Sequence, residues 1–382
     1  MHYSVDSARV PFIVLTILAA ILLEGILMVD GGLFAMLKPV WTQTLADGKY
    51  LHQVYTGLPI IDQILAISVC FWDPVATNLP ILRLQSIMLC APLQTFAVWA
   101  TIESMRRGEK HTLLRVVPIY VFLWQYLGTA IFFPFYLFVE LSQHFGSSDR
   151  SDPSISYYDA KALLPATLLA MVLPYRNVYF PPSGTTDAQH HMFIAFYQLG
   201  PFATYILTAG IAKYISSGKE EESRLPSNSD APWIKAIYAV YGIFSALAHI
   251  GVILRVAFSS DPTFSLSRLF FPAFQNLWNP EAAARRYVEE HLFFLQWDFI
   301  LVVLGCSIYA SRVAQGMYSS RESGSSTLFG VGGILIASLA SMIFSPGAMI
   351  TAILYVREDF IRQEYATKQR REKQTEVLQD SQ

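Results

Sequence analysis

The run PFIVLTILAAILLEGILMV, residues 11–29, decides the fold class of this chain. A helix needs about 20 mainly apolar residues to cross a bilayer, because lipid offers no partner to backbone N–H and C=O groups. The run is not preceded by a Lys/Arg-rich start and no small-residue cleavage site follows it, so we expect a retained transmembrane helix rather than a signal peptide. One ionisable residue, Glu24, interrupts the run.

Similar apolar runs recur along the chain and are separated by connectors rich in Gly, Ser and Asp. The sequence therefore predicts an all-α polytopic transmembrane helical bundle of seven to nine spans. We expect one membrane domain over residues 1–356 and a polar cytosolic C-terminal tail over residues 357–382. The expected spans are 11–29, 55–76, 81–102, 116–143, 160–175, 190–214, 233–257, 291–313 and 327–355.

The composition excludes several classes of protein. Of 382 residues, 53% are apolar and 15% are charged, whereas a soluble domain carries about 25% charged residues. The net charge of −2 is spread over loops without a basic face, which argues against nucleic-acid binding. Cys70, Cys90 and Cys306 have no CxxC spacing, so the sequence predicts neither a disulfide framework nor a zinc site.

The basic residues indicate an orientation. In a nine-span arrangement, the larger share of the 27 Lys and Arg falls in one set of alternate loops that includes the C-terminal tail. By the positive-inside rule, this places the C-terminus in the cytosol and the N-terminus on the opposite side.

Carboxyl groups inside the predicted spans are the best pointers to function, because each one costs about 2.5 to 3.5 kcal/mol to insert. Asp298 lies in FFLQWDFILVVL, residues 293–304. An unpaired acid there is expected to carry its proton, and a neutral acid facing a cavity could protonate an apolar substrate. The alternative is a hydrogen bond between helices.

For three further candidate residues, a purely structural role is the alternative to a role in function. Asp62 follows Leu58-Pro-Ile-Ile and could be an interfacial carboxylate at a helix start. Glu103 ends an apolar run and could pair with Arg106 or Arg107 at the headgroups. His249 stands alone in Ala-Leu-Ala-His-Ile-Gly and could be an interhelical hydrogen-bonding residue.

Absent motifs narrow the chemistry. The histidine boxes of a membrane di-iron enzyme are missing, and so are the DDxxD or NDxxD clusters that hold magnesium against a diphosphate. No Gly-rich phosphate loop, GxSxG elbow or HExxH occurs. Acid-initiated chemistry on a lipid-soluble molecule, transport and sensing remain compatible. The 26 Phe, 20 Tyr and 7 Trp could include rings that stabilise a cation, although core packing explains most of them.

Several short motifs occur in the order seen in one known family. They are Asp62-Gln-Ile-Leu, Phe71-Trp72 with Pro74-Val75, Leu84-Gln85-Ser86, Ile102-Glu-Ser-Met-Arg-Arg-Gly108, Gln198-Leu-Gly-Pro201 and Leu295-Gln-Trp-Asp298. Over about residues 55–310, the chain thus resembles fungal membrane-bound terpene cyclases of meroterpenoid biosynthesis, of the ascochlorin, ascofuranone and macrophorin type.

The resemblance implies an enzyme of the endoplasmic reticulum membrane that uses no metal or other cofactor. Such enzymes protonate an epoxide or alkene of a farnesylated aromatic or pyrone polyketide and cyclise its prenyl chain. It implies Asp62, Glu103 and Asp298 as acid or base candidates. The residues implied for substrate binding are Trp72, Arg106, Tyr126, Gln198, His249 and Trp297.

The sequence alone is also compatible with a different class of protein. In a proton-coupled small-molecule transporter or a receptor, the same intramembrane acids would relay protons or bind a ligand. We find no internal repeat at a fixed period.

Overall fold

The structure, a computed structural model, is helical throughout the part of the chain that it describes. That part contains one isolated bridge, between Thr44 and Tyr50, and no extended strand. The all-α prediction is therefore confirmed there. The described residues are 5–45, 47–77, 80–145, 151–218, 225–261, 263–277, 286–319 and 328–380.

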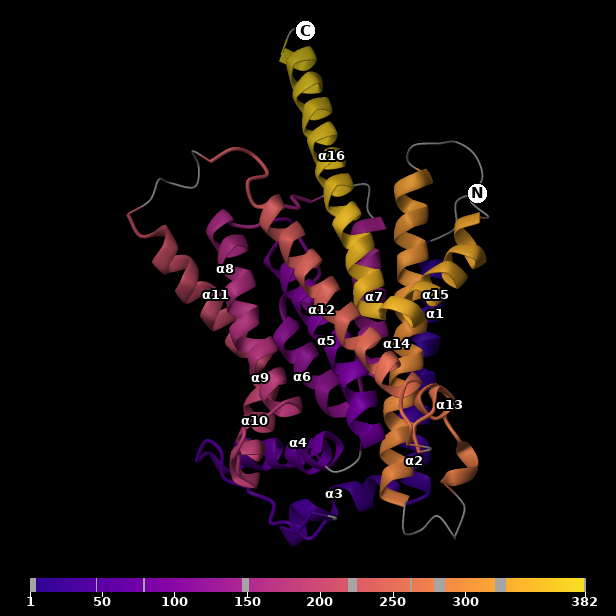
Figure 1. Cartoon of the computed structure of the whole chain (residues 1–382). Helices are drawn as coiled ribbons and strands as arrows, with labels where there is room; N and C mark the ends of the chain where they lie inside the picture. The colour runs from indigo at the N-terminus through magenta and orange to yellow at the C-terminus, as the bar shows by residue number, and fades with distance from the viewer. Residues whose placement is uncertain are drawn as a thin grey trace.

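A central helix, α5 (Pro80–Met105), forms the core of the bundle. Nearly all its side chains are buried, including Phe96 and Trp99, because other helices surround it (Figure 1). It packs against α12 (Ala231–Ala257), α14 (Arg286–Ser319) and α16 (Pro346–Asp380).

Five helices of the described chain are long and apolar enough to cross a membrane, or six if one bent pair counts as a span. The expected seven to nine spans are thus not reached in the described residues. The bent pair is α10 (Asp187–Gln198) and α11 (Gly200–Ser216), which meet at 68°. The five segments are Arg9–Val29, Pro59–Thr77, Pro80–Met105, Ala231–Ala257 and Val288–Tyr318.

The first predicted span is present but is not a regular α-helix. It consists of α1 (Val5–Ala19), a π-helical turn η1 (Ala20–Gly25) and α2 (Ile26–Val29). The predicted span 160–175 lies in a similar composite of α8 (Tyr157–Thr167), the π-helical turn η3 (Leu168–Val172) and α9 (Leu173–Tyr179).

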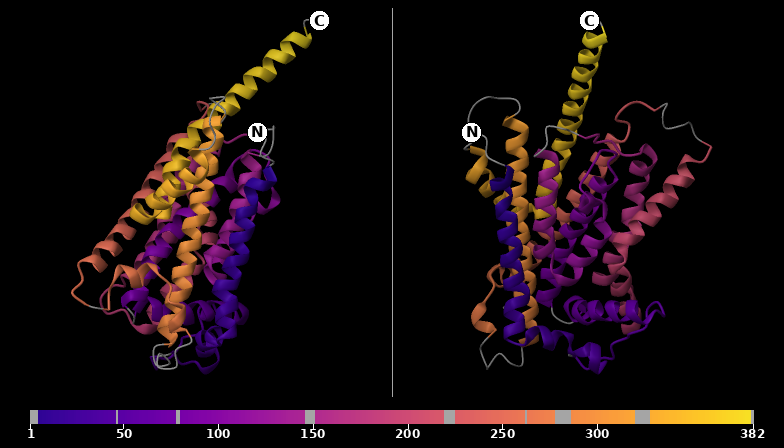
Figure 2. Two further views of the ribbon diagram at one scale, coloured as in Figure 1. Left: turned by 90° about the vertical axis from the view of Figure 1, so that its right-hand side faces the viewer. Right: turned by 180° about the vertical axis from the view of Figure 1, so that it is seen from behind.

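Two helices lie across one end of the bundle rather than along it. These are α3 (Gly32–Thr42) and α4 (Pro59–Thr77), which Figure 1 and the rear view in Figure 2 show roughly perpendicular to α5. The predicted span 55–76 coincides with α4, which is long and apolar enough for a span but lies across the other helices. Together α3 and α4 close this end of the bundle.

Two other predicted spans are helical hairpins. The segment 116–143 folds as α6 (Val117–Leu127) and α7 (Thr129–Phe145), which reverse direction at Gly128 with a φ of 93°. The segment 327–355 folds as α15 (Gly333–Phe344) and the start of α16, which reverse at Ser345 with a φ of 116°. A single residue with positive φ is enough to end one helix and start the next, so neither segment is one straight helix.

The start of α1 and the end of α16 lie at the same end of the bundle (Figures 1 and 2). This arrangement differs from the one expected for nine upright spans, which would put the two termini at opposite ends of the bundle. The predicted domain boundary at residue 357 falls inside α16, which continues beyond the bundle as an exposed helix.

Candidate active site

A cavity of about 300 Å³ lies inside the bundle, and the crosswise helices α3 and α4 form part of its wall. The tip of the α6–α7 hairpin, the π-helical turn η1, α5, α10 and α14 form the rest of its wall. Of the site residues predicted from the sequence, four line this cavity: Trp72, Tyr126, Gln198 and Asp298.

Asp298 is held in the cavity wall by the hairpin tip. Its carboxyl oxygens accept hydrogen bonds from the backbone N–H groups of Thr129, at 3.2 Å, and Ala130, at 2.5 Å. These are the first two residues of α7, so Asp298 caps that helix from α14 and is 2% exposed. The interhelical hydrogen bond expected as the alternative role is present, and the same residue lines the cavity. The carboxyl group therefore has hydrogen-bond partners and is not the unpaired acid considered from the sequence.

The backbone at Gly128 brings these groups together. A Cβ atom placed there would lie 2.8 Å from Leu23 Cδ1, 3.3 Å from Phe294 Cζ and 3.9 Å from Asp298 Oδ1. Glycine also accepts the φ of 93° that this tip requires. The hairpin tip can therefore approach both α14 and the first membrane helix.

Aromatic rings form much of the cavity wall. Phe71 lies at 5.0 Å from Trp72 and at 5.4 Å from Phe294 between ring centroids, with both pairs edge to face. Trp124 and Tyr126 come from the end of α6. Ring faces in a water-poor cavity stabilise a cation by about 2 kcal/mol or more.

Several buried polar atoms of the cavity wall have no hydrogen-bond partner within the described part of the chain. They are Trp124 Nε1, Gln125 Oε1, Thr129 Oγ1 and Gln198 Oε1. A buried polar group without a partner costs about 1 to 3 kcal/mol, so these atoms are available to hydrogen-bond water or a bound molecule in the cavity.

Glu24 also lines the cavity but is not among the site residues predicted from the sequence. It lies in the π-helical turn η1 and is half-buried. The signal available in the sequence was its position as the one acid of an apolar run. That signal was ambiguous because no polar neighbour lies nearby in the chain.

Asp62 lies outside the cavity, at the start of α4. Its carboxylate accepts the backbone N–H groups of Tyr55, Thr56 and Gly57 and the hydroxyl of Thr56. It thereby fixes the loop that leads into α4, and its place in the first turn of that helix agrees with the helix-start position of the structural alternative. The nearby Asp73 binds His190 Nδ1 at 2.7 Å.

Glu103 and Arg106 lie in a buried network of ion pairs away from the cavity. Arg106 binds Glu103, with 2.9 Å between Nε and Oε2, and Glu358, with 2.7 Å between Nη2 and Oε2. Arg357 joins Glu103, at 3.0 Å, to Glu140, at 2.8 Å. The network ties α5 and α7 to α16, and the pairs that join different helices lie more than 200 residues apart in the chain.

Arg362 extends this network to the residue before α12. It binds Glu358 at 2.7 Å and Asp230 at 2.8 Å. Burial acts to raise the pKa of Asp230, but hydrogen bonds from Arg362 and the backbone N–H of Ile155 hold that pKa below its usual range. Asp230 is therefore ionised at neutral pH.

His249 and Trp297 also lie away from the cavity. His249 Nε2 donates to the carbonyl oxygen of Met342 at 2.9 Å, and its ring stacks on Phe299 at 5.9 Å. Trp297 packs against Phe274 at 5.9 Å and Phe293 at 6.3 Å. Their contacts are those of packing residues between helices.

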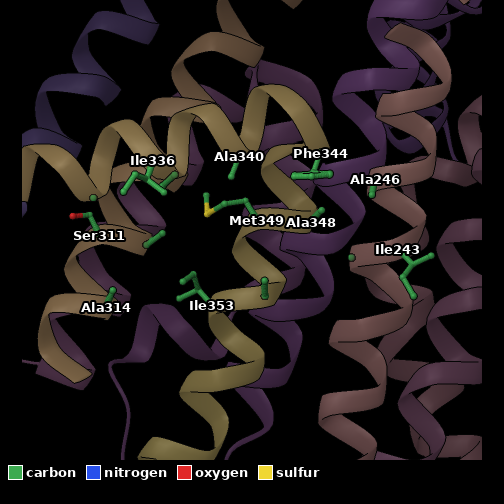
Figure 3. Close-up of a pocket in the computed structure, with 15 residues that line it drawn as sticks. Ile243, Ala246, Ser311, Ala314, Ile336, Ala340, Phe344, Ala348, Met349 and Ile353 are labelled. Carbon is green, nitrogen blue, oxygen red and sulfur yellow. The ribbon is translucent and has the colours of Figure 1, made fainter. Parts of the chain in front are cut away.

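A larger pocket of about 590 Å³ lies among α12, α14, α15 and α16. Figure 3 shows that its wall consists of small and aliphatic side chains such as Ala340, Ile336 and Ile353, with Ser311 at one edge. No titratable side chain lines it. This pocket can hold apolar groups but offers no acid or base.

The family relationship covers all the elements that form the cavity. The model of the CtvD domain matches residues 8–362. The chain belongs to the CtvD family. No solved structure matches it.

Curated relatives of this CtvD chain have the name terpene cyclase. Terpene cyclase DEP1 of Fusarium langsethiae is 26% identical over 344 residues, covering 86% of this chain and 92% of that protein. DEP1 of Alternaria brassicicola is 25% identical over 352 residues, covering 86% and 93%. Terpene cyclase ascI of Acremonium egyptiacum is 25% identical over 343 residues, covering 87% and 86%. The resemblance to fungal terpene cyclases is thereby confirmed.

Proposed function

We propose that this CtvD protein is a membrane-bound terpene cyclase. Its substrate is a farnesylated aromatic or pyrone polyketide, and its reaction is acid-initiated cyclisation of the prenyl chain without a metal or other cofactor. The observation that carries the proposal is one cavity in which a carboxyl group, aromatic rings and unpaired polar atoms meet. The names of the relatives support the same reaction class.

The dimensions of the cavity agree with this substrate class. A volume of about 300 Å³ lies at the small end of the range for ligand pockets. The apolar wall suits a folded prenyl chain. The unpaired Trp124 N–H and Thr129 hydroxyl can donate hydrogen bonds to an epoxide oxygen.

The reaction needs one proton transfer to the substrate at its start and one proton transfer from the carbocation at its end. A carboxylic acid protonates the epoxide oxygen or an alkene carbon, and alkene electron pairs of the chain then form the ring bonds. The resulting carbocation lies among Trp72, Tyr126 and Phe294, whose rings stabilise it. Loss of a proton to a carboxylate gives the product alkene. Asp298 is the predicted acid or base that lies in position for one of these transfers.

An activity assay tests the proposal. Microsomes or purified protein should convert an epoxyfarnesyl arene to a cyclised isomer in the presence of EDTA. Asp298→Asn should lower turnover by about 100-fold or more, since general acid–base groups contribute about 10² to 10⁴. Asp261→Asn is the control, because Asp261 lies in an exposed loop. Unchanged turnover in Asp298→Asn would remove this residue from the mechanism.

The alternative of a proton-coupled transporter has one structural feature in its favour. The hairpins broken at Gly128 and Ser345 resemble the discontinuous helices found at transporter binding sites. Substrate flux into proteoliposomes that collapses with the pH gradient, without any cyclised product, would support transport instead.

We also propose an endoplasmic reticulum location with the C-terminus in the cytosol. The C-terminal part of α16, which projects from one end of the bundle, contains Lys368, Arg370, Arg371 and Lys373.

A further inference from the structure

Two carboxyl groups line the cavity in the described part of the chain, and the proposed reaction needs two. Asp298 reaches the cavity from α14 and Glu24 from the π-helical turn η1. Leu23, the neighbour of Glu24, is the residue that a Cβ at Gly128 would meet first. The turn that bears Glu24 and the carboxyl group of Asp298 thus approach the same hairpin tip.

Because η1 is a π-helical turn, the Glu24 side chain points in a different direction from the one it would have in a regular α-helix. A π-turn inserts one residue into an α-helix and rotates the side chains around it, and such turns are frequent at functional sites. The turn extends from Ala20 to Gly25, between two α-helical segments of the same span. Leu22 and Leu23 are buried, and Glu24 lines the cavity.

The two carboxyl groups differ in their hydrogen-bond donors, and this difference suits them to different roles in proton transfer. Asp298 is more deeply buried than Glu24, which opposes its ionisation, but both its oxygens accept backbone N–H groups at the N-terminus of α7, where donors and the helix dipole stabilise an anion. No described residue donates a hydrogen bond to Glu24. A carboxyl group without donors in an apolar wall is most stable with its proton bound.

We propose that Glu24 delivers the proton that starts cyclisation and that the Asp298 carboxylate accepts the proton released at its end. This assignment rests on the proposed cyclase function. The Glu24 proton passes to the epoxide oxygen, the C–O bond breaks, and the alkene electron pair forms the new C–C bond. The final carbocation loses a proton to Asp298, and a proton returns to Glu24 before the next turnover. Substrate and product are isomers, so no other reactant is needed.

Product analysis of two variants tests the division of roles. Glu24→Gln should leave the substrate unreacted, with turnover lowered about 100-fold or more. Asp298→Asn should still consume a small fraction of substrate, but the cation should end as water-trapped or rearranged products. Glu372→Gln, on the exposed part of α16, is the control and should match the wild type. Water-trapped products from Glu24→Gln, or unchanged products from both variants, would overturn the assignment.

A second measurement does not depend on turnover. At neutral pH, the infrared band of a protonated carboxyl group should be weaker in Glu24→Gln than in wild type and unchanged in Asp298→Asn. Loss of the band in Asp298→Asn alone would reverse the roles and overturn the inference. Wild-type protein without cyclase activity would contradict the proposed function, whereas this spectrum would still show which acid carries the proton. Unfolding midpoints in detergent establish that each variant is folded.

Discussion

Gly128 is the residue on which the geometry of the cavity depends most. Its positive φ allows the α6–α7 hairpin to reverse, and its missing side chain leaves room for Leu23 and Phe294. The first N–H groups of α7 then reach Asp298. One backbone position therefore determines both the shape of the wall and the direction of the acid.

Replacing Gly128 with alanine should impair both folding and activity. The backbone strain should cost about 1 to 3 kcal/mol, and the displaced Leu23 and Phe294 should lower turnover further. Gly184→Ala is a matched control, because Gly184 has a φ of 81° and nothing within 4 Å of an added Cβ. Unfolding midpoints and turnover check this prediction. Equal turnover in the two variants would contradict it.

The sequence identifies individual residues only where the local pattern is unusual. Asp298 stands out in an apolar run, whereas Trp72 was implied only by the family resemblance, and both line the cavity. The pairing of Glu103 with Arg106 was expected and is present, whereas its contact with Arg357, 254 positions away, could not be predicted. Asp62 and Asp298 are both acids in apolar segments, and the sequence alone does not show which one faces a cavity.

At the scale of elements, the buried ion pairs hold the long helix α16 against α5 and α7. Arg357 is 1% exposed and binds both Glu103 and Glu140. Such a network contributes to the arrangement of helices, because removing one member leaves opposite charges buried without their partner. The sequence places Arg357 in a polar tail, yet the first turns of this tail belong to the core.

Arg357→Met should therefore destabilise the protein by about 3 to 5 kcal/mol. Lys235→Met serves as the control, since the Lys235–Asp359 pair is partly exposed and should contribute less than about 1 kcal/mol. Denaturant unfolding in detergent micelles measures both changes. Equal stability of the two variants would show that the network is not structural.

The Asp230–Arg362 pair should make stability depend on pH in the acid range. The pKa of Asp230 is lower in the folded protein than its usual value near 4, so the folded state binds fewer protons than the unfolded state there. The contribution is complete above pH 4 and is lost as pH falls through the lowered folded pKa. Thermal unfolding from pH 6 to pH 3 should show a smaller acid-dependent loss in Asp230→Asn than in wild type. An identical acid dependence in both would contradict this.

At the scale of the whole molecule, apolar segments take three arrangements: upright helices, a crosswise helix and hairpins. Hydropathy located these segments well, because it reports burial in an apolar environment. It did not distinguish their directions, since one residue such as Gly128 or Ser345 can reverse a helix. The expected placement of the termini depended on the number of upright spans, and the two termini instead lie at the same end of the bundle.

The two termini should lie on the same side of the membrane. Epitope tags at each terminus should both be digested by protease added to sealed microsomes, because both chain termini lie at the end of the bundle that faces the cytosol in the proposed orientation. A tag in the loop between α9 and α10 (residues 180–186) should be protected from the protease until detergent is added. Protection of one terminal tag alone would contradict the shared end.

The central claim is that the prenyl chain reacts in the cavity beside Asp298 and not in the larger apolar pocket. Photolabelling with a farnesylated arene that carries a diazirine at its chain end tests this most directly, with labelled peptides identified by mass spectrometry. The account predicts labels on the hairpin tip between Trp124 and Thr129 or on Phe294. Labels on Ile336 or Phe344, in the larger pocket of Figure 3, with none on the hairpin tip would contradict it.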